Sequence, residues 1–144
     1  MSEITLAQAS AIVDAALRKG RELELEPLTV VVLDRGGHLV AAKREDDSGI
    51  LRFEIAFAKA FGALGFGFGS RGLATRAGKA PHFVGAVASV ADGRMVPAPG
   101  GVLIRTDDGR VAGAVGISGD TGDNDEVCAV HAIASADLKA DAGS

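Results

Sequence analysis

The sequence predicts an α+β domain in which helices cover the faces of a mainly antiparallel sheet. Two short turns carry this prediction, because each lies between two apolar, β-branched segments: Asp34-Arg35-Gly36-Gly37 and Thr106-Asp107-Asp108-Gly109. Strands that a tight turn connects pair antiparallel. The 144 residues suit one domain over residues 1–144, and no linker-like stretch divides them.

The first and last helices are predicted from residues that can cap their N-termini. Thr5 is followed three residues later by Gln8, which is the spacing of a capping box. Asp123 or Asn124 can cap the last helix in the same manner. Both predicted helices therefore have a defined start.

Apolar periodicity and turn residues place the remaining elements. We expect helices over about 6–22, 51–64, 70–77 and 123–138, and strands over 28–33, 38–43, 102–105 and 111–118. Residues 81–90 fit either a helix or a strand, and residues 140–144 are expected to fray. In the second helix, we expect Phe53, Ala56, Phe57 and Ala60 to form one apolar face.

Composition narrows the class of protein. The formal net charge of −4 gives no basis for binding nucleic acid or an anionic membrane, and no segment is long and apolar enough to span a bilayer. The single cysteine, Cys128, excludes an internal disulfide and fits a reducing compartment. The first residues lack the pattern of a signal peptide. We therefore expect a cytoplasmic protein.

Two carboxylates at the start of the last predicted helix, Asp125 and Glu126, are candidate functional groups. They follow a glycine-lined turn after Ser118. Interaction with the helix dipole explains them without any ligand. The functional interpretation makes Glu126 a general base or a ligand contact beside that turn.

Lys59 is the second candidate, because it interrupts an otherwise apolar helical run over residues 55–61. An ammonium among apolar side chains must reach the surface, pair with a carboxylate or face a site. We expect Lys59 to reach Asp125, Glu126 or the carboxylate of a ligand at the edge of a pocket. The variant Lys59→Met is then expected to keep the fold and to weaken ligand binding.

A small anionic molecule would find further contacts near Lys59. Arg52 lies two helical turns before Lys59, although a solvated helix face explains Arg52 equally well. The backbone N–H groups of a glycine pair can bind an anion. The predicted substrate-binding residues are Arg52, Gly100, Gly101, Ser118 and Asp125.

The histidines are candidate ligands of a cofactor rather than of a metal ion. His131 lies three residues after Cys128, but no second such pair is near, so we expect no metal site. His38 and His82 are candidate axial ligands of haem, as are His131 and Met95. Covalent haem attachment is excluded because the chain has no Cys-x-x-Cys-His sequence.

A series of short motifs resembles one known family. In chain order they are Asp34-x-Gly36-Gly37, Ala58-Lys59-Ala60, Pro99-Gly100-Gly101, the segment 113–119 and Asp125-Glu126. Together they resemble the GlcG/HbpS-like family of haem-binding or "haem-degrading" domains, which is related to the C-terminal domain of a class of corrinoid adenosyltransferases. The resemblance implies a profilin-like three-layer fold with a five-stranded sheet, and ring-like homo-oligomers.

Two functions follow as hypotheses. The first is a small-molecule-binding domain whose ligand is haem or another planar or anionic molecule. No family haem ligand maps onto this chain residue by residue, so we expect weak haem binding. The second is a small enzyme without a redox cofactor, of the lyase, isomerase or dehydratase type. It would act on a small organic acid by proton transfer, with Glu126 as base and Lys59 or Arg52 holding the carboxylate.

We predict a homo-oligomer of about four chains or more, in line with the resemblance. Strands rich in small residues and the loop that carries Phe66 and Phe68 suggest surfaces too apolar for a monomer. Light scattering on the purified protein measures the assembly directly. A mass near 14.5 kDa at micromolar concentration would show a monomer and contradict the prediction.

Overall fold

The computed structural model describes residues 3–144 and confirms an α+β domain built on a five-stranded sheet. The strand order is β2-β1-β4-β3-β5, and each neighbouring pair runs antiparallel. The strands are β1 (Thr29–Asp34), β2 (Leu39–Arg44), β3 (Gly101–Arg105), β4 (Val111–Ser118) and β5 (Lys139–Asp141). The two predicted hairpins connect β1 to β2 and β3 to β4.

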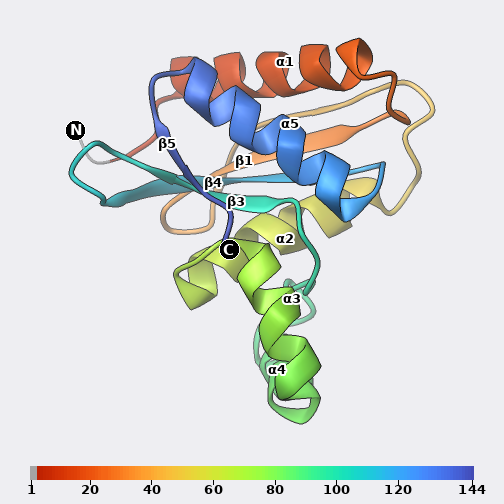
Figure 1. Cartoon of the computed structure of the whole chain (residues 1–144), viewed down its shortest axis with the longest axis vertical. Helices are drawn as coiled ribbons and strands as arrows, with labels where there is room; N and C mark the ends of the chain where they lie inside the picture. Colours follow the sequence, from red (N-terminus) through yellow and green to blue (C-terminus); the bar gives the residue numbers. More distant parts are fainter. Residues whose placement is uncertain (1–2) are drawn as a thin grey trace.

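The helices form two layers on either side of the sheet, as Figure 1 shows. Helices α1 (Leu6–Glu22) and α5 (Gly122–Ser135) pack together on one face, and α2 (Arg52–Phe66) covers the other. Alternate residues of β1 serve the two faces: Val30 and Val32 pack with α1 and α5, whereas Val31 and Leu33 pack with α2. The predicted three-layer arrangement is confirmed.

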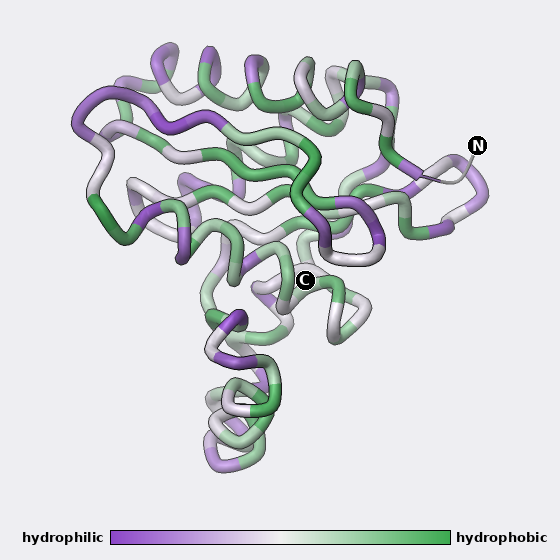
Figure 2. The backbone as a smooth tube through the Cα atoms, turned by 180° about the vertical axis from the view of Figure 1, so that it is seen from behind, coloured by the Kyte–Doolittle hydropathy of each residue, from purple (hydrophilic) through white to green (hydrophobic). Residues whose placement is uncertain are grey.

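Helices α3 (Ser70–Lys79) and α4 (Pro81–Val90) form an arm that extends away from the sheet (Figure 1). Leu73, Val84 and Met95 make a small separate core at the base of this arm. Figure 2 shows hydrophobic stretches gathered in the central strands, while the hairpin turns are hydrophilic. No helix within residues 3–144 has both the length and the apolar character needed to cross a membrane.

Several local predictions are confirmed and several are corrected. Thr5 and Gln8 form the capping box of α1. Thr121, rather than Asp123 or Asn124, caps α5: its Oγ1 accepts a hydrogen bond of 3.2 Å from the N–H of Asn124. The ambiguous segment 81–90 is helical and begins with proline, which suits the first turn of a helix.

The C-terminal residues do not fray as expected. Residues 139–141 form β5, which pairs with β3 at the edge of the sheet. The guanidinium of Arg105 holds the carboxylate of Asp141 at 2.8 Å. Backbone pairing and this ion pair together order residues 139–141, although composition alone indicates a frayed end.

The loop containing Phe66 and Phe68 also differs from expectation. Helix α2 continues to Phe66 and ends at Gly67, whose φ of +82° closes the helix in the left-handed conformation. The two rings pack edge to face at 5.8 Å within the core of the arm. Packing inside the chain therefore covers part of each of these two half-buried phenylalanines.

Helix α2 lies unusually close to the sheet, because two glycines face it. Gly101 of β3 and Gly116 of β4 are register partners. A methyl group at Gly116 would overlap the carbonyl oxygen of Ala56, and one at Gly101 would overlap that of Lys59. The backbone of α2 thus rests directly on the backbone of two strands.

We predict that Gly116→Ala lowers the free energy of unfolding by about 3 kcal/mol or more, because α2 must move away from the sheet. Chemical denaturation followed by circular dichroism measures the change. Gly65→Ala is the matched control, because Gly65 lies in α2 itself and a methyl group there would enter open space. The control should stabilise the protein by about 0.5–1 kcal/mol. Equal effects of the two variants would contradict the close-contact explanation.

Candidate functional site

A buried ion pair joins the two helical layers at one end of the sheet. Lys59 of α2 places Nζ 3.1 Å from Oδ2 of Asp125 of α5, and the two residues are only 4% and 1% exposed. Nζ also donates a hydrogen bond of 2.9 Å to the carbonyl oxygen of Ile117. The N–H of Asp120 donates to the other carboxylate oxygen of Asp125. The predicted contact between Lys59 and a carboxylate of the 125–126 pair is confirmed.

Burial shifts both members of this pair towards their neutral forms. Desolvation lowers the pKa of Lys59, while the nearby Asp125 carboxylate opposes that shift. Desolvation likewise raises the pKa of Asp125, and the Lys59 ammonium opposes it. Each charge is therefore tolerated in the interior only because the other is present.

The glycine pair predicted to bind an anion lies beside Lys59. Gly100 has a φ of +121°, and a Cβ at this position would stand 2.9 Å from Lys59 Nζ. The N–H of Gly101, however, already donates to Oγ of Ser70 at 2.7 Å. Ser70 Oγ in turn donates to the carbonyl oxygen of Ala98. Contacts within the chain therefore use the Gly101 donor.

Arg52 and Ser118 form a second contact near the buried pair. Nη1 of Arg52 donates to Oγ of Ser118 at 3.0 Å. The Arg52 charge is close enough to lower the pKa of Lys59 further, after the larger effect of burial. The structure thus brings Arg52, Lys59, Gly100, Ser118 and Asp125 to the same end of the sheet.

Glu126, the candidate base, is held by an arginine that sequence reasoning missed. Nε of Arg71 lies 3.0 Å from Oε1 of Glu126, and Nη2 of the same guanidinium pairs with Asp123. Arg71 belongs to α3, 55 positions away from Glu126 in the chain. No local pattern could link two residues so far apart in sequence.

The three histidines lie on separate elements, and all are exposed. His38 is in the β1–β2 turn, His82 in the first turn of α4 and His131 on α5. The thiol of Cys128 is buried, which raises its pKa to about 11, so it does not share the exposed surroundings of His131. Within residues 3–144, no three His, Cys, Asp or Glu side chains are grouped to hold a metal ion. Met95 is buried in the core of the arm.

His38 differs from the other two histidines in having a carboxylate partner. Its Nδ1 lies 3.3 Å from Oδ1 of Asp34, and its side chain is 81% exposed. The same carboxylate oxygen accepts hydrogen bonds from the N–H groups of Gly36 and His38. Partial burial opposes the shift, but these hydrogen bonds lower the pKa of Asp34. Nε2 of His38 has no partner among the described residues.

Phe53, Phe57 and Phe61 form a row along α2, which we call the phenylalanine row. Successive ring centroids are 6.1 and 5.9 Å apart, and the three side chains are half-buried. The single apolar face expected for this helix is confirmed: Ala56 and Ala60 pack against the sheet, and the three rings are half-buried against the same hydrophobic core. Only methyl-sized side chains fit where α2 rests on the glycines.

Two cavities lie along the phenylalanine row, and together we call them the aromatic groove. The larger, of about 300 Å³, is lined by Phe53, Phe57 and the loop 92–94, together with Glu54. The smaller, of about 70 Å³, is lined by Phe61, Met95 and residues of α4. Arg94 lines both cavities, and its guanidinium stands 4.3 Å from the centre of the Phe61 ring.

The turn that carries His38 touches the same groove. A Cβ at Gly37, whose φ is +84°, would stand 2.7 Å from Cε2 of Phe61. The backbone of the β1–β2 turn therefore packs against the ring that Arg94 covers. His38 is the next residue in the chain, and the Arg94 guanidinium over Phe61 has no ion-pair partner among the described residues.

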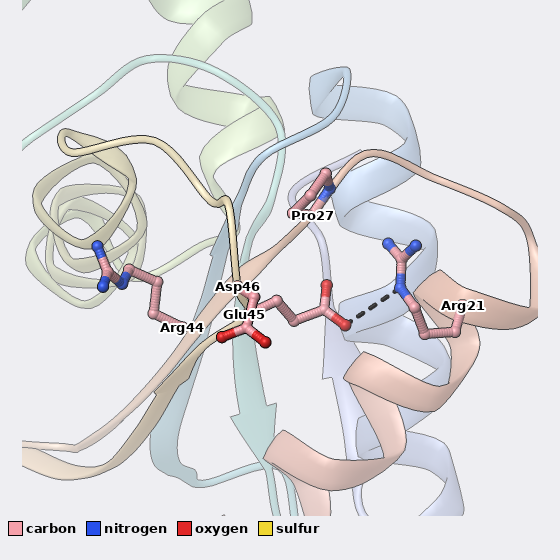
Figure 3. A pocket seen from close by; sticks show the side chains of 5 residues that line it. All are labelled: Arg21, Pro27, Arg44, Glu45 and Asp46. Carbon is pink, nitrogen blue, oxygen red and sulfur yellow. Dashed lines mark ion pairs between the residues drawn. The ribbon is translucent and has the colours of Figure 1, made fainter.

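A cavity elsewhere is a poorer candidate. Figure 3 shows a hollow of about 430 Å³ lined by Arg21, Pro27, Arg44, Glu45 and Asp46. Arg21 Nε and Glu45 Oε2 are 3.1 Å apart and neutralise each other, and Arg44 points away from them in this view. Arg44 and Asp46 also line this hollow, but no aromatic side chain does.

The chain belongs to the HbpS-like family. Residues 4–134 match the family model described as "Haem degrading protein HbpS-like", which confirms the predicted resemblance. A curated relative is an uncharacterized 15.0 kDa protein from the dhaT-dhaS intergenic region of Citrobacter freundii, 28% identical over 92% of each chain.

Solved structures support the same assignment. The crystal structure of HbpS is 26% identical, with a TM-score of 0.80, over 94% of this chain and 91% of the other. Klebsiella pneumoniae protein ORFY is also 26% identical, with a TM-score of 0.82, over 93% and 90%. A PduOC:heme complex, at 24% identity and a TM-score of 0.84 over 94% and 96%, shares the fold.

The burial of Asp125 changes the expectation for Lys59→Met. Removing the ammonium leaves an uncompensated buried carboxylate, so we predict a loss of about 3–5 kcal/mol in the free energy of unfolding. The raised pKa of Asp125 means that the folded variant holds its proton more tightly than the unfolded chain. Stability therefore falls as pH rises, and lowering the pH from about 7 to about 5 should recover part of the loss. Urea denaturation at several pH values measures this.

Lys43→Met is the matched control for that experiment. Lys43 pairs with Asp14 at 2.8 Å, but both side chains are about half exposed. The control should change the free energy of unfolding by less than about 1 kcal/mol at any of these pH values. A Lys59→Met protein as stable as this control would show that the buried pair contributes nothing to folding.

Proposed function

We propose that this protein binds haem in the aromatic groove, with His38 as the axial ligand. His38 carries the proposal: its Nδ1 is held by Asp34, its Nε2 is free, and the preceding residue, Gly37, packs against Phe61 at the end of the phenylalanine row. Family membership supports it, as does the fold shared with a protein whose crystal structure is a haem complex.

The residues present fit the chemical needs of a porphyrin. A haem ligand histidine is commonly oriented by a hydrogen bond from its other ring nitrogen to a carboxylate, which also makes it more basic. The flat apolar macrocycle requires aromatic or aliphatic surface, which Phe57 and Phe61 supply. When bound, the iron supplies coordination chemistry, and the chain supplies the nitrogen and the ring contacts.

The half-buried phenylalanine row indicates modest affinity. Ligand sites that bind tightly enclose most of the ligand surface, whereas these rings line an open groove. We therefore propose a dissociation constant on the order of micromolar, in agreement with the weak binding expected from the sequence.

The alternative enzyme remains a prediction with less support. Lys59 is buried against Asp125, and Glu126 is held by Arg71, so both proposed groups are already engaged. A substrate acid would have to displace these partners. We retain the homo-oligomer and the cytoplasmic location as proposals that accompany haem binding.

We predict that titration of haem into the protein shifts the Soret band with one-to-one stoichiometry and that His38→Ala weakens this binding by about tenfold or more. His82→Ala and His131→Ala are matched controls, because both histidines are exposed but lie on other elements. Absorption spectroscopy measures all four proteins under the same conditions. A Soret shift that is equal in the wild type and in His38→Ala would overturn the assignment of the ligand.

A further inference from the structure

Resting on the proposed haem site, we infer that Arg94 binds a carboxylate of the ligand. The groove would then select planar rings that carry free carboxylates and discriminate against the corresponding uncharged esters. Arg94 contributes recognition in this scheme, while His38 contributes coordination. The two roles are separable by experiment.

The position of Arg94 is set by its own segment of backbone. Helix α4 ends in a tight turn, where Asp92 and Gly93 both have positive φ values of 55° and 75°. The N–H of Gly93 donates to the carbonyl oxygen of Ala88 at 2.8 Å, and the N–H of Arg94 to that of Ala91 at 3.1 Å. These bonds direct the chain back over α2 and bring the Arg94 side chain to the phenylalanine row.

The guanidinium of Arg94 is anchored but not neutralised. Nε donates to the carbonyl oxygen of Ala91 at 2.9 Å, and the Phe61 ring lies beneath the group at 4.3 Å. Glu54 and Asp92 line the same cavity, but within residues 3–144 neither forms an ion pair with Arg94. Both Nη atoms therefore remain available to an acceptor.

Two other arginines of the domain show that guanidinium groups in this protein bind carboxylates. Arg71 and Arg105 each use their guanidinium nitrogens on carboxylates of the same chain. A guanidinium can bind a carboxylate through two parallel hydrogen bonds, which gives direction as well as attraction. Arg94 lines both cavities. A planar ligand that lies on Phe57 and Phe61 would therefore bring its carboxylate to the Nη atoms of Arg94.

A thermodynamic cycle between ligand and protein tests this contact. Haem and haem dimethyl ester, whose propionates are blocked, are titrated into wild type, Arg94→Leu and Arg94→Gln. We expect the wild type to bind haem about tenfold more tightly than the ester, and both variants to bind the two ligands within about twofold of each other. Arg76→Leu is the matched control, since Arg76 also stacks on a phenylalanine, Phe68, but lines a different cavity. The control should keep the wild-type preference.

Metal-free protoporphyrin, followed by fluorescence, separates recognition from coordination. Arg94→Leu should weaken its binding by about tenfold, because the propionates are recognised without any iron, whereas Arg76→Leu should leave it unchanged because Arg76 lines a different cavity. Equal affinity of the wild type for haem and its ester would overturn the inference and leave haem binding intact. Failure of the wild type to bind haem or protoporphyrin would overturn both proposals. Circular dichroism confirms that each variant is folded.

Discussion

The close contact between α2 and the sheet is the constraint on which the other features depend. Gly101 and Gly116 remove every side chain from the strand surface at this point, so the helix carbonyls of Ala56 and Lys59 meet the strands directly. Ala56 and Ala60 occupy the inner side of the helix, and the larger phenylalanines are half-buried against the same core. The two glycines thus set how closely the helix, with its row of half-buried rings, approaches the sheet.

Lys59 follows from this geometry as well. It lies where α2 passes the end of the sheet, so its side chain can extend past β4 to reach Asp125 on the opposite layer. A longer separation between helix and sheet would leave the ammonium without its carboxylate. The ion pair also fixes the start of α5, and Arg71 attaches α3 to the same helix through Glu126. The end of the sheet is therefore a rigid junction of three helices.

Local sequence patterns predicted the architecture and one contact of the candidate site, but not its surroundings. Hairpin turns, the capping box at Thr5 and the isolated charge of Lys59 are signals within short segments, and each was confirmed. Arg71 and Arg94 were missed because their partners come from distant segments.

The junction and the aromatic groove lie on different parts of α2 and have opposite properties. At the junction, Lys59, Asp125 and Glu126 are satisfied by one another or by Arg71; Lys59 and Asp125 are buried, and Glu126 is partly buried. At the groove, the Arg94 guanidinium lies over Phe61 without an ion-pair partner among the described residues, and Gly37, the neighbour of His38, packs against the same ring. Exposed donors beside half-buried rings suit a ligand that is flat, apolar and acidic at its edge. The ion pairs at the junction hold α2 in place against the rest of the fold. The aromatic groove lies on the helix that they hold.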